Sequence, residues 1–197
     1  MRDFFAAHVG LLPAFDSAIA SYDTETARHS TRVGIGAAAL GRARGMSADE
    51  LDWLQWAGIL HDLGKLAVPG AILRKEGPLR DEEWEEMRRH PVVGAQLLRA
   101  ISAELEPIAV AVESHHERWD GSGYPYGLAE QAIPLGGRMV AVADVFDSIT
   151  HRRNYRPYVL EPAAAVRTLA GAAGSQLDPE LVGLFIELFN LGQIPTT

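Results

Sequence analysis

The chain contains no cysteine among its 197 residues, so it can form neither a disulfide framework nor a thiolate metal site. It also has no long uncharged apolar run, because arginine, aspartate or glutamate interrupts every candidate stretch, and this excludes a membrane-spanning helix. The segment that begins Met1-Arg2-Asp3 lacks the charged region, apolar stretch and cleavage site of a signal peptide. We therefore expect a cytoplasmic protein, which the absence of cysteine permits but does not require.

An excess of positive charge is also absent, since the formal net charge is −8. Proteins that follow a nucleic-acid backbone usually present a basic surface, so this charge argues against a nucleic-acid polymer as a partner. The negative net charge is still compatible with a small anionic ligand, because a metal cluster would add local positive charge that outweighs the average field of the protein. The length and a hydrophobic content of 47% predict one domain at 21–190, with an N-terminal helical arm at 1–20 and a tail at 191–197.

The sequence also lacks a convincing β-strand pattern. Its apolar residues recur at helical spacing, which predicts an all-α fold. Ser47 and Glu50 form a capping box that begins one helix. The Asp178-Pro179 pair begins the last helix, because proline suits the first turn. Glycine and proline mark two loops, at 66–79 and 117–137, and a loop as long as the second is more often functional than idle. The expected helices span 24–45, Ser47 to Gly64, 81–89, a segment from Pro91, 104–116, 138–150, 161–173 and 179–190.

Two adjacent pairs of potential metal ligands, His61-Asp62 and His115-His116, are the most informative feature of the sequence. Such pairs are costly to bury in a core unless their polar atoms are satisfied. Neighbours on a helix point about 100° apart, so each pair can serve two ions or bridge them. Each pair stands where a predicted helix ends. Together they favour a metal-dependent hydrolase.

Four further candidate ligands lie elsewhere in the chain. Glu25 and His29 are four residues apart and therefore share one helix face. His90 precedes a proline, and Asp144 lies in an apolar run, where an unpaired carboxylate is costly. Taken singly, each has an ordinary interpretation as a surface histidine, a solvated glutamate or an aspartate paired with arginine. Their combination with the two adjacent pairs favours metal ligation.

Several conspicuous residues fall outside this pattern. His8 and His151 are expected on the surface. Trp53 and Trp56, three residues apart on a helix, are expected in the core rather than at a site.

Along the chain, these candidate ligands occur in order with Gly64-Lys65 and Gly123-Tyr124-Pro125. In this order of residues and motifs, the sequence resembles the HD-GYP branch of the HD-domain phosphohydrolases. The resemblance covers residues 20–190, and its longest motif is His-His-Glu-x-x-Asp-Gly-x-Gly-Tyr-Pro at 115–125. It implies an HD-domain helical bundle whose long Gly/Pro loop carries the Gly-Tyr-Pro motif. It also implies a centre of two or three divalent ions, iron or manganese, and hydrolysis of cyclic di-GMP.

Carried over position by position, the resemblance implies a role for each matching residue. Glu25 stands where three-metal members place an additional glutamate, which favours a trinuclear site. Lys65 matches the lysine that contacts the scissile phosphate, although a lysine near a helix C-terminus is also favourable in itself. Tyr124, Arg153 and Arg156 match positions that hold the bases and phosphates of the ligand. The implied metal ligands are Glu25, His29, His61, Asp62, His90, His115, His116 and Asp144.

The resemblance implies a phosphodiesterase that opens cyclic di-GMP to linear pGpG and, after a second cut, to GMP. A metal-bridging hydroxide would attack the diester, with Asp62 as the bridging carboxylate and Lys65 as an electrostatic contact to phosphate. Two alternatives stay open: a module that binds a cyclic dinucleotide and signals with little turnover, or a hydrolase of a related cyclic dinucleotide such as cyclic GMP-AMP. Expected partners are the substrate and a GGDEF-domain or other signalling protein at the Gly-Tyr-Pro loop.

The sequence departs from the family pattern at two places. It has Val68-Pro69-Gly70 where the family usually has Ile-Pro-Asp, and Arg152-Arg153-Asn154-Tyr155-Arg156 where the family usually has Asp-Arg-Pro-Tyr-Arg. The second change adds a positive charge and removes a proline, so substrate preference or affinity could differ. No receiver, sensory or GGDEF domain is expected within the chain, which is either a stand-alone enzyme or a piece of a longer protein.

Overall fold

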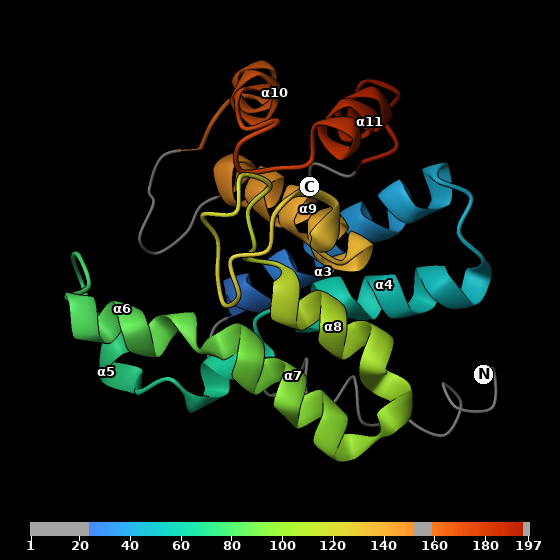
Figure 1. Cartoon of the computed structure of the whole chain (residues 1–197). Helices are drawn as coiled ribbons and strands as arrows, with labels where there is room; N and C mark the ends of the chain where they lie inside the picture. Colours follow the sequence, from blue (N-terminus) through green and yellow to red (C-terminus); the bar gives the residue numbers. More distant parts are fainter. Residues whose placement is uncertain (1–23, 152–158, 195–197) are drawn as a thin grey trace.

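The computed structural model describes residues 24–151 and 159–194, so the predicted arm at 1–20 lies outside it. Within these ranges the fold is helical and contains no β-strand, which confirms the all-α prediction (Figure 1). The α-helices are α3 (Thr24–Ala43), α4 (Ala48–Leu60), α5 (Gly70–Leu73), α6 (Asp81–Arg88), α7 (His90–Ile101), α8 (Glu106–Ser114), α9 (Leu135–Thr150), α10 (Pro162–Gly171) and α11 (Pro179–Asn190). The 3-10 helices are η1 (Leu63–Ala67), η2 (Ala103–Leu105) and η3 (Glu130–Ala132).

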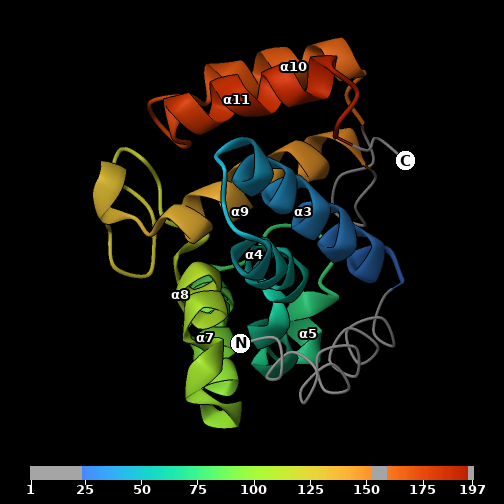
Figure 2. The ribbon, with the colours of Figure 1, turned by 90° about the vertical axis from the view of Figure 1, so that its right-hand side faces the viewer.

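The hydrophobic core is centred on four helices and extends to α7, α10 and α11. Helix α3 packs on α4 and α9, and α8 packs on α4 and α9. Helices α10 and α11 lie side by side as a layer over α9, which Figures 1 and 2 show from two directions. The largest fully buried side chains include Leu40, Leu54, Leu60, Leu98, Met139 and Phe185.

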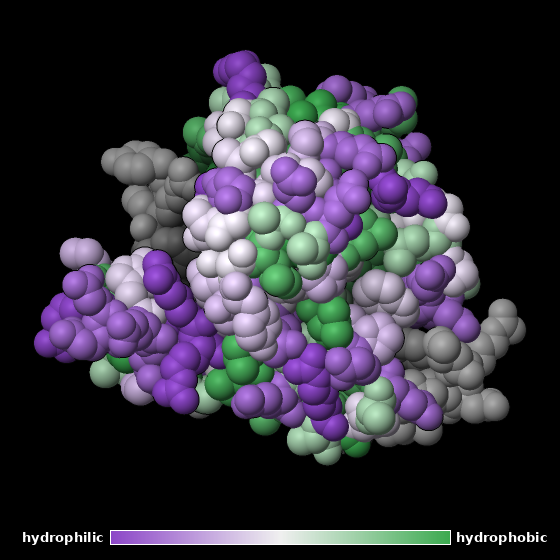
Figure 3. Space-filling view, in the orientation of Figure 1, coloured by the Kyte–Doolittle hydropathy of each residue, from purple (hydrophilic) through white to green (hydrophobic). Residues whose placement is uncertain are grey.

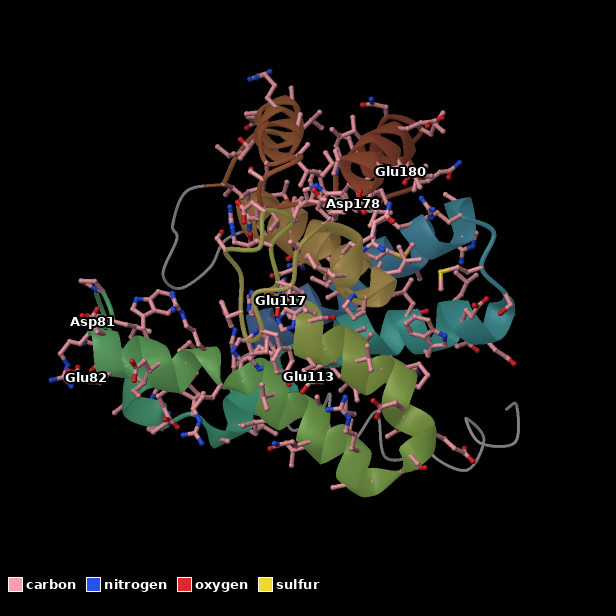
Figure 4. The ribbon with its side chains drawn as sticks, in the orientation of Figure 1. Asp81, Glu82, Glu113, Glu117, Asp178 and Glu180 are labelled. Carbon is pink, nitrogen blue, oxygen red and sulfur yellow. The ribbon has the colours of Figure 1, made fainter. Side chains whose placement is uncertain are left out.

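Two predicted helix starts are confirmed by their caps. The Ser47 amide donates to Glu50 Oε2 at 2.8 Å, and the Ser47 hydroxyl accepts the Glu50 amide, so the capping box of α4 is complete. Asp178 Oδ1 accepts the first free amides of α11, including that of Glu180 at 2.9 Å. Its second oxygen accepts from Arg138 on α9 at 2.6 Å, so this cap also ties α11 to α9 (Figure 4).

Close backbone contacts at glycines bring the site-bearing segments together. A Cβ atom on Gly58 of α4 would lie 2.5 Å from the Cα of Gly34 on α3, and one on Gly64 would lie 1.9 Å from the carbonyl oxygen of His90. Side chains at these positions would push the helices apart. The glycines therefore allow α3, α4, η1 and α7 to approach closely enough for their polar side chains to meet.

The structure differs from the sequence-based boundaries in a few segments. Residues 70–73, predicted within a loop, form the single-turn helix α5, and α9 begins at Leu135 rather than 138. Helix α6 has no buried residue, and the surface over it is predominantly hydrophilic in Figure 3. Among the described helices, none is long and apolar enough to cross a membrane.

Candidate metal centre

Seven of the eight predicted ligands have described side chains, and the fold brings all seven together. They come from the interiors of α3 and α9, the junction of α4 and η1, the start of α7 and the end of α8. They fall into two groups, each of which could hold a metal ion because its ligand atoms lie within 4.8 Å of one another. The first group is His29, His61 and Asp144, and the second is Asp62, His90, His115 and His116. The eighth residue, Glu25, belongs to α3, but its side chain lies outside the described set.

Backbone carbonyls fix the orientation of three of these histidines. The Nδ1 atoms of His61, His90 and His115 donate to the carbonyl oxygens three residues earlier, at 2.7, 2.8 and 2.6 Å. A carbonyl oxygen can only accept, so each Nδ1 must carry the proton, and each neutral ring presents a lone pair on Nε2. Metal-binding histidines are commonly held by this kind of hydrogen bond from the other ring nitrogen.

The Nε2 atoms then face one another across the site. His29 Nε2 lies 3.3 Å from His61 Nε2, and His29 donates through Nδ1 to Asp147 at 2.7 Å. The Nε2 atoms of His90 and His115 are buried and make no hydrogen bond with any described residue. Lone pairs directed at one another or left without a donor are unfavourable unless a positive charge lies between them. The donor set therefore fits divalent cations.

Asp62 is positioned to link the two groups. Its Oδ1 lies 3.3 Å from His90 Nε2, and its Oδ2 lies 3.4 Å from His61 Nε2. Burial alone would raise the pKa of Asp62, but the Lys65 ammonium and the His61 imidazole hold that pKa well below its ordinary value. Asp62 is therefore an ionised carboxylate at neutral pH, with one oxygen directed to each group.

Burial keeps the histidines of the second group neutral. It lowers the pKa of His90 to about 4 and that of His116 to about 3, and it holds the pKa of His115 well below its ordinary value. The pKa of His61 moves the other way, because Asp62 and Asp144 outweigh the effect of its burial. Neutral imidazoles are the form that binds metal.

A cavity of about 380 Å³ opens beside the two groups. Asp62, His115, His116 and Asp144 line it, and so do Lys65 and Tyr124, two of the predicted substrate contacts. Lys65 Nζ donates to Asp62 Oδ2 at 2.6 Å. The other two predicted contacts, Arg153 and Arg156, lie outside the described residues.

Tyr124 packs against a predicted ligand. Its ring stacks on that of His116, with centroids 4.8 Å apart and an interplanar angle of 25°. Burial and the nearby charge of Asp62 raise its pKa, so its hydroxyl keeps its proton and can donate to an anionic ligand.

Glu117 holds the loop that presents Tyr124, a role that the sequence did not suggest. Its side chain is buried and accepts the backbone amides of Tyr126 at 2.7 Å and Leu128 at 3.0 Å. Figure 4 shows it at the root of the loop, beyond the end of α8. Two further amides of the loop donate to carbonyls at 175 and 176, between α10 and α11, so the loop is fixed from both sides.

Asp147 is a second residue that sequence reasoning missed. It lies one turn after Asp144 in the same apolar run, and it accepts from His29 and from Arg32 Nε at 2.5 Å. The spacing of three residues between two aspartates in one apolar run was the available signal. His151, expected on the surface, is also part of this cluster: its side chain is 18% exposed, and its Nδ1 lies 3.0 Å from Asp147 Oδ1. His151 is partly exposed rather than fully on the surface, because both its amide and its ring contact Asp147. Trp53 and Trp56 pack against the core, as predicted.

Comparison with known proteins gives a family and several relatives. A family model described as HD domain matches residues 13–181. A cyclic di-GMP phosphodiesterase of Thermotoga maritima is 44% identical over 168 residues, which is 84% of this chain and 45% of the relative. The 3'3'-cGAMP-specific phosphodiesterase 2 of Vibrio cholerae is 36% identical over 173 residues, which is 87% of this chain and 33% of the relative. The chain thus spans less than half the length of these curated relatives.

The fold also has counterparts among solved structures. Bd1817, an HDG"Y"P protein from Bdellovibrio bacteriovorus, superposes with a TM-score of 0.64 at 19% identity. The match covers 82% of this chain and 51% of that chain. At this level of identity the likeness supports the fold and no more.

Proposed function

The chain belongs to the HD domain family, in the HD-GYP branch that its motifs resemble, and we propose that it is a metal-dependent phosphodiesterase that hydrolyses cyclic di-GMP. The observation that carries the proposal is the set of buried Nε2 and carboxylate atoms directed at one another beside a cavity that Lys65 lines. The relative named cyclic di-GMP phosphodiesterase, 44% identical, supports this substrate.

We propose that the two groups hold two divalent ions and that Glu25 adds a ligand for a third. Imidazole and carboxylate ligands without thiolates suit iron or manganese, and we propose one of these metals. When bound, such ions acidify water and neutralise charge on the phosphoryl oxygens. Asp62 is the proposed bridging ligand because its two oxygens face different groups. The remaining proposed ligands are His29, His61, His90, His115, His116 and Asp144.

The chain's own residues hold and orient the diester. Lys65 carries a positive charge at the edge of the cavity and is the proposed contact to the scissile phosphate, where developing negative charge needs compensation. The Tyr124 hydroxyl offers a second donor, and Arg153 and Arg156 are the proposed contacts to bases and phosphates. In the reaction, water oxygen bonds to phosphorus and the P–O3′ bond breaks, with one proton passing to the 3′-oxygen. The product is linear pGpG, and the same step repeated gives GMP.

One alternative substrate has specific support, and one alternative function does not. The relative named 3'3'-cGAMP-specific phosphodiesterase 2 favours cyclic GMP-AMP as a second candidate substrate. A binding module with little turnover is the other possibility. The ionised Asp62 and the Lys65 that donates to it argue against a binding module, because a protein that only binds the dinucleotide needs neither residue.

The test is incubation of iron- or manganese-loaded protein with cyclic di-GMP under reducing conditions, followed by chromatography of the products. We expect pGpG, with a lower kcat/KM for cyclic GMP-AMP. Tight binding without turnover at any metal loading would instead assign a receptor. Elemental analysis of the wild type and Glu25→Ala counts the ions, and a content of two per chain that Glu25→Ala leaves unchanged would exclude the third ion.

We also propose a signalling partner and a cellular location. Tyr126, in the Gly-Tyr-Pro loop, is 59% exposed, which supports contact with a GGDEF-domain or other signalling protein through this loop. A pull-down with Tyr126→Ala as the control tests it, and equal capture by both proteins would contradict it. A cytoplasmic location is proposed from the sequence, and cell fractionation tests it.

A further inference from the structure

Three cationic side chains line the cavity among the described residues, and they differ in their partners. Lys65 is paired with Asp62 at 2.6 Å, and Arg118 lies 3.2 Å from Asp120 Oδ2. Arg88 makes no hydrogen bond or ion pair with any residue in the described ranges. A cation at the rim of a cavity without a counter-ion is a binding element for an anion that the protein itself does not supply.

The backbone fixes Arg88 close to the metal-ligand groups. It is the last residue of α6, and the carbonyl of its neighbour Met87 accepts the proton of His90 Nδ1 at 2.8 Å. The turn that presents Arg88 is therefore the turn that orients a proposed ligand. A substituent bound by Arg88 would be held in a defined place relative to the reacting phosphate.

An aromatic contact also restrains the Arg88 side chain. Its guanidinium carbon lies 5.5 Å from the centroid of the Tyr124 ring, which stacks on His116. A cation–π contact uses the charge of the guanidinium and leaves its N–H donors available. The Tyr124 ring therefore contacts both a proposed ligand, His116, and the Arg88 guanidinium.

A cyclic dinucleotide needs a cation at such a place. It carries two phosphodiesters, and only one can be attacked at a time. The second negative charge must be held in a cavity that Asp62 and Asp144 also line, and Lys65 is assigned to the first phosphate. An arginine fork binds a phosphate through two parallel hydrogen bonds, which a lysine cannot do.

We propose that Arg88 binds the non-reacting phosphodiester of the cyclic dinucleotide and so selects the cyclic substrate over a diester with one phosphate. This inference rests on the proposed function. It identifies Arg88 as a specificity-determining residue, whereas Lys65 acts at the scissile phosphate.

The test compares two substrates with the same bases. Cyclic di-GMP has two guanines and two phosphodiesters, whereas the dinucleoside monophosphate GpG has two guanines and one. Kd and KM are measured for the wild type, Arg88→Gln, Arg88→Lys and the control Arg89→Gln, on metal-loaded protein. Arg89 is the adjacent arginine, is 69% exposed and pairs with Glu86 on the surface, so its substitution removes the same charge outside the cavity.

We expect Arg88→Gln to raise Kd and KM for cyclic di-GMP about 10- to 100-fold and to leave those for GpG unchanged, the usual range for a charged hydrogen bond. Arg88→Lys should fall between, and Arg89→Gln should match the wild type. Unchanged Kd and KM for cyclic di-GMP in Arg88→Gln would overturn the inference. An equal rise in Kd and KM for both substrates would also overturn it, because it would assign Arg88 to a guanine edge. A wild type that turns over cyclic di-GMP while Arg88→Gln is unimpaired refutes this inference alone. A wild type that neither binds nor hydrolyses cyclic di-GMP refutes the proposed function as well.

Discussion

Substitution of Glu117 by glutamine should loosen the Gly-Tyr-Pro loop without changing the size of the side chain. The buried carboxylate accepts two backbone amides, from Tyr126 at 2.7 Å and Leu128 at 3.0 Å. Glutamine replaces one accepting oxygen with an NH₂ group, so one of these amides would face a donor and stay unsatisfied. An unsatisfied buried group costs about 1–3 kcal/mol. For a chain of this size, that corresponds to a Tm lower by roughly 2–12 °C.

Thermal unfolding of metal-free Glu117→Gln, followed by circular dichroism, measures this loss directly. The matched control is Glu113→Gln, the same change on α8 (Figure 4). Glu113 contacts the same loop through the Tyr126 hydroxyl at 2.8 Å and pairs with Arg99, but this contact lies at the surface. It should therefore cost only about 0–1 kcal/mol. A Tm for Glu117→Gln no lower than that of Glu113→Gln would refute the argument that buried acceptors fix the loop.

Three further predictions follow from the site. Lys65→Ala should keep its metal content by elemental analysis but lose at least about 10²-fold in kcat, and retained activity would remove Lys65 from the mechanism. Asp147→Ala, which frees His29 Nδ1, should weaken metal affinity about 10- to 100-fold in a chelator titration, whereas an unchanged affinity would mean that Asp147 does not support His29. The Tm of the chelated protein should fall as pH drops from 7 to 4. Burial lowers the folded-state pKa values of His90 and His116 to about 4 and about 3, below the unfolded value near 6.5, so the unfolded chain binds protons first. A flat profile would contradict those shifts.

The fold was predictable where local signals and periodicity agreed. The capping box at Ser47 and the Asp178-Pro179 start are readable from the sequence, because a cap involves residues only two or three positions apart. The short helix α5 was not predictable, since one turn between prolines and glycines carries no periodic signal.

The candidate site, like the fold, was predictable only in part from the sequence. The adjacent pairs of potential ligands are conspicuous in the sequence, and the structure brings seven of the predicted ligands into two groups. Asp147, Glu117 and Arg88 were missed because their roles depend on contacts with distant segments or with the loop. Asp147 meets His29 across 118 positions, and Arg88 meets Tyr124 only after folding. The three-residue spacing of Asp144 and Asp147 indicates a shared helix face, but no spacing rule predicts a contact with a distant segment.

We propose that two groups of histidine and aspartate form a metal centre that cleaves a cyclic dinucleotide. The most direct test measures cyclic di-GMP turnover and metal content on the same sample, before chelation, after chelation and after reloading with manganese or iron. We expect two or three ions per chain, loss of pGpG formation on chelation and its return on reloading. Turnover that persists at zero metal content, or a fully loaded protein that forms no pGpG, would contradict it.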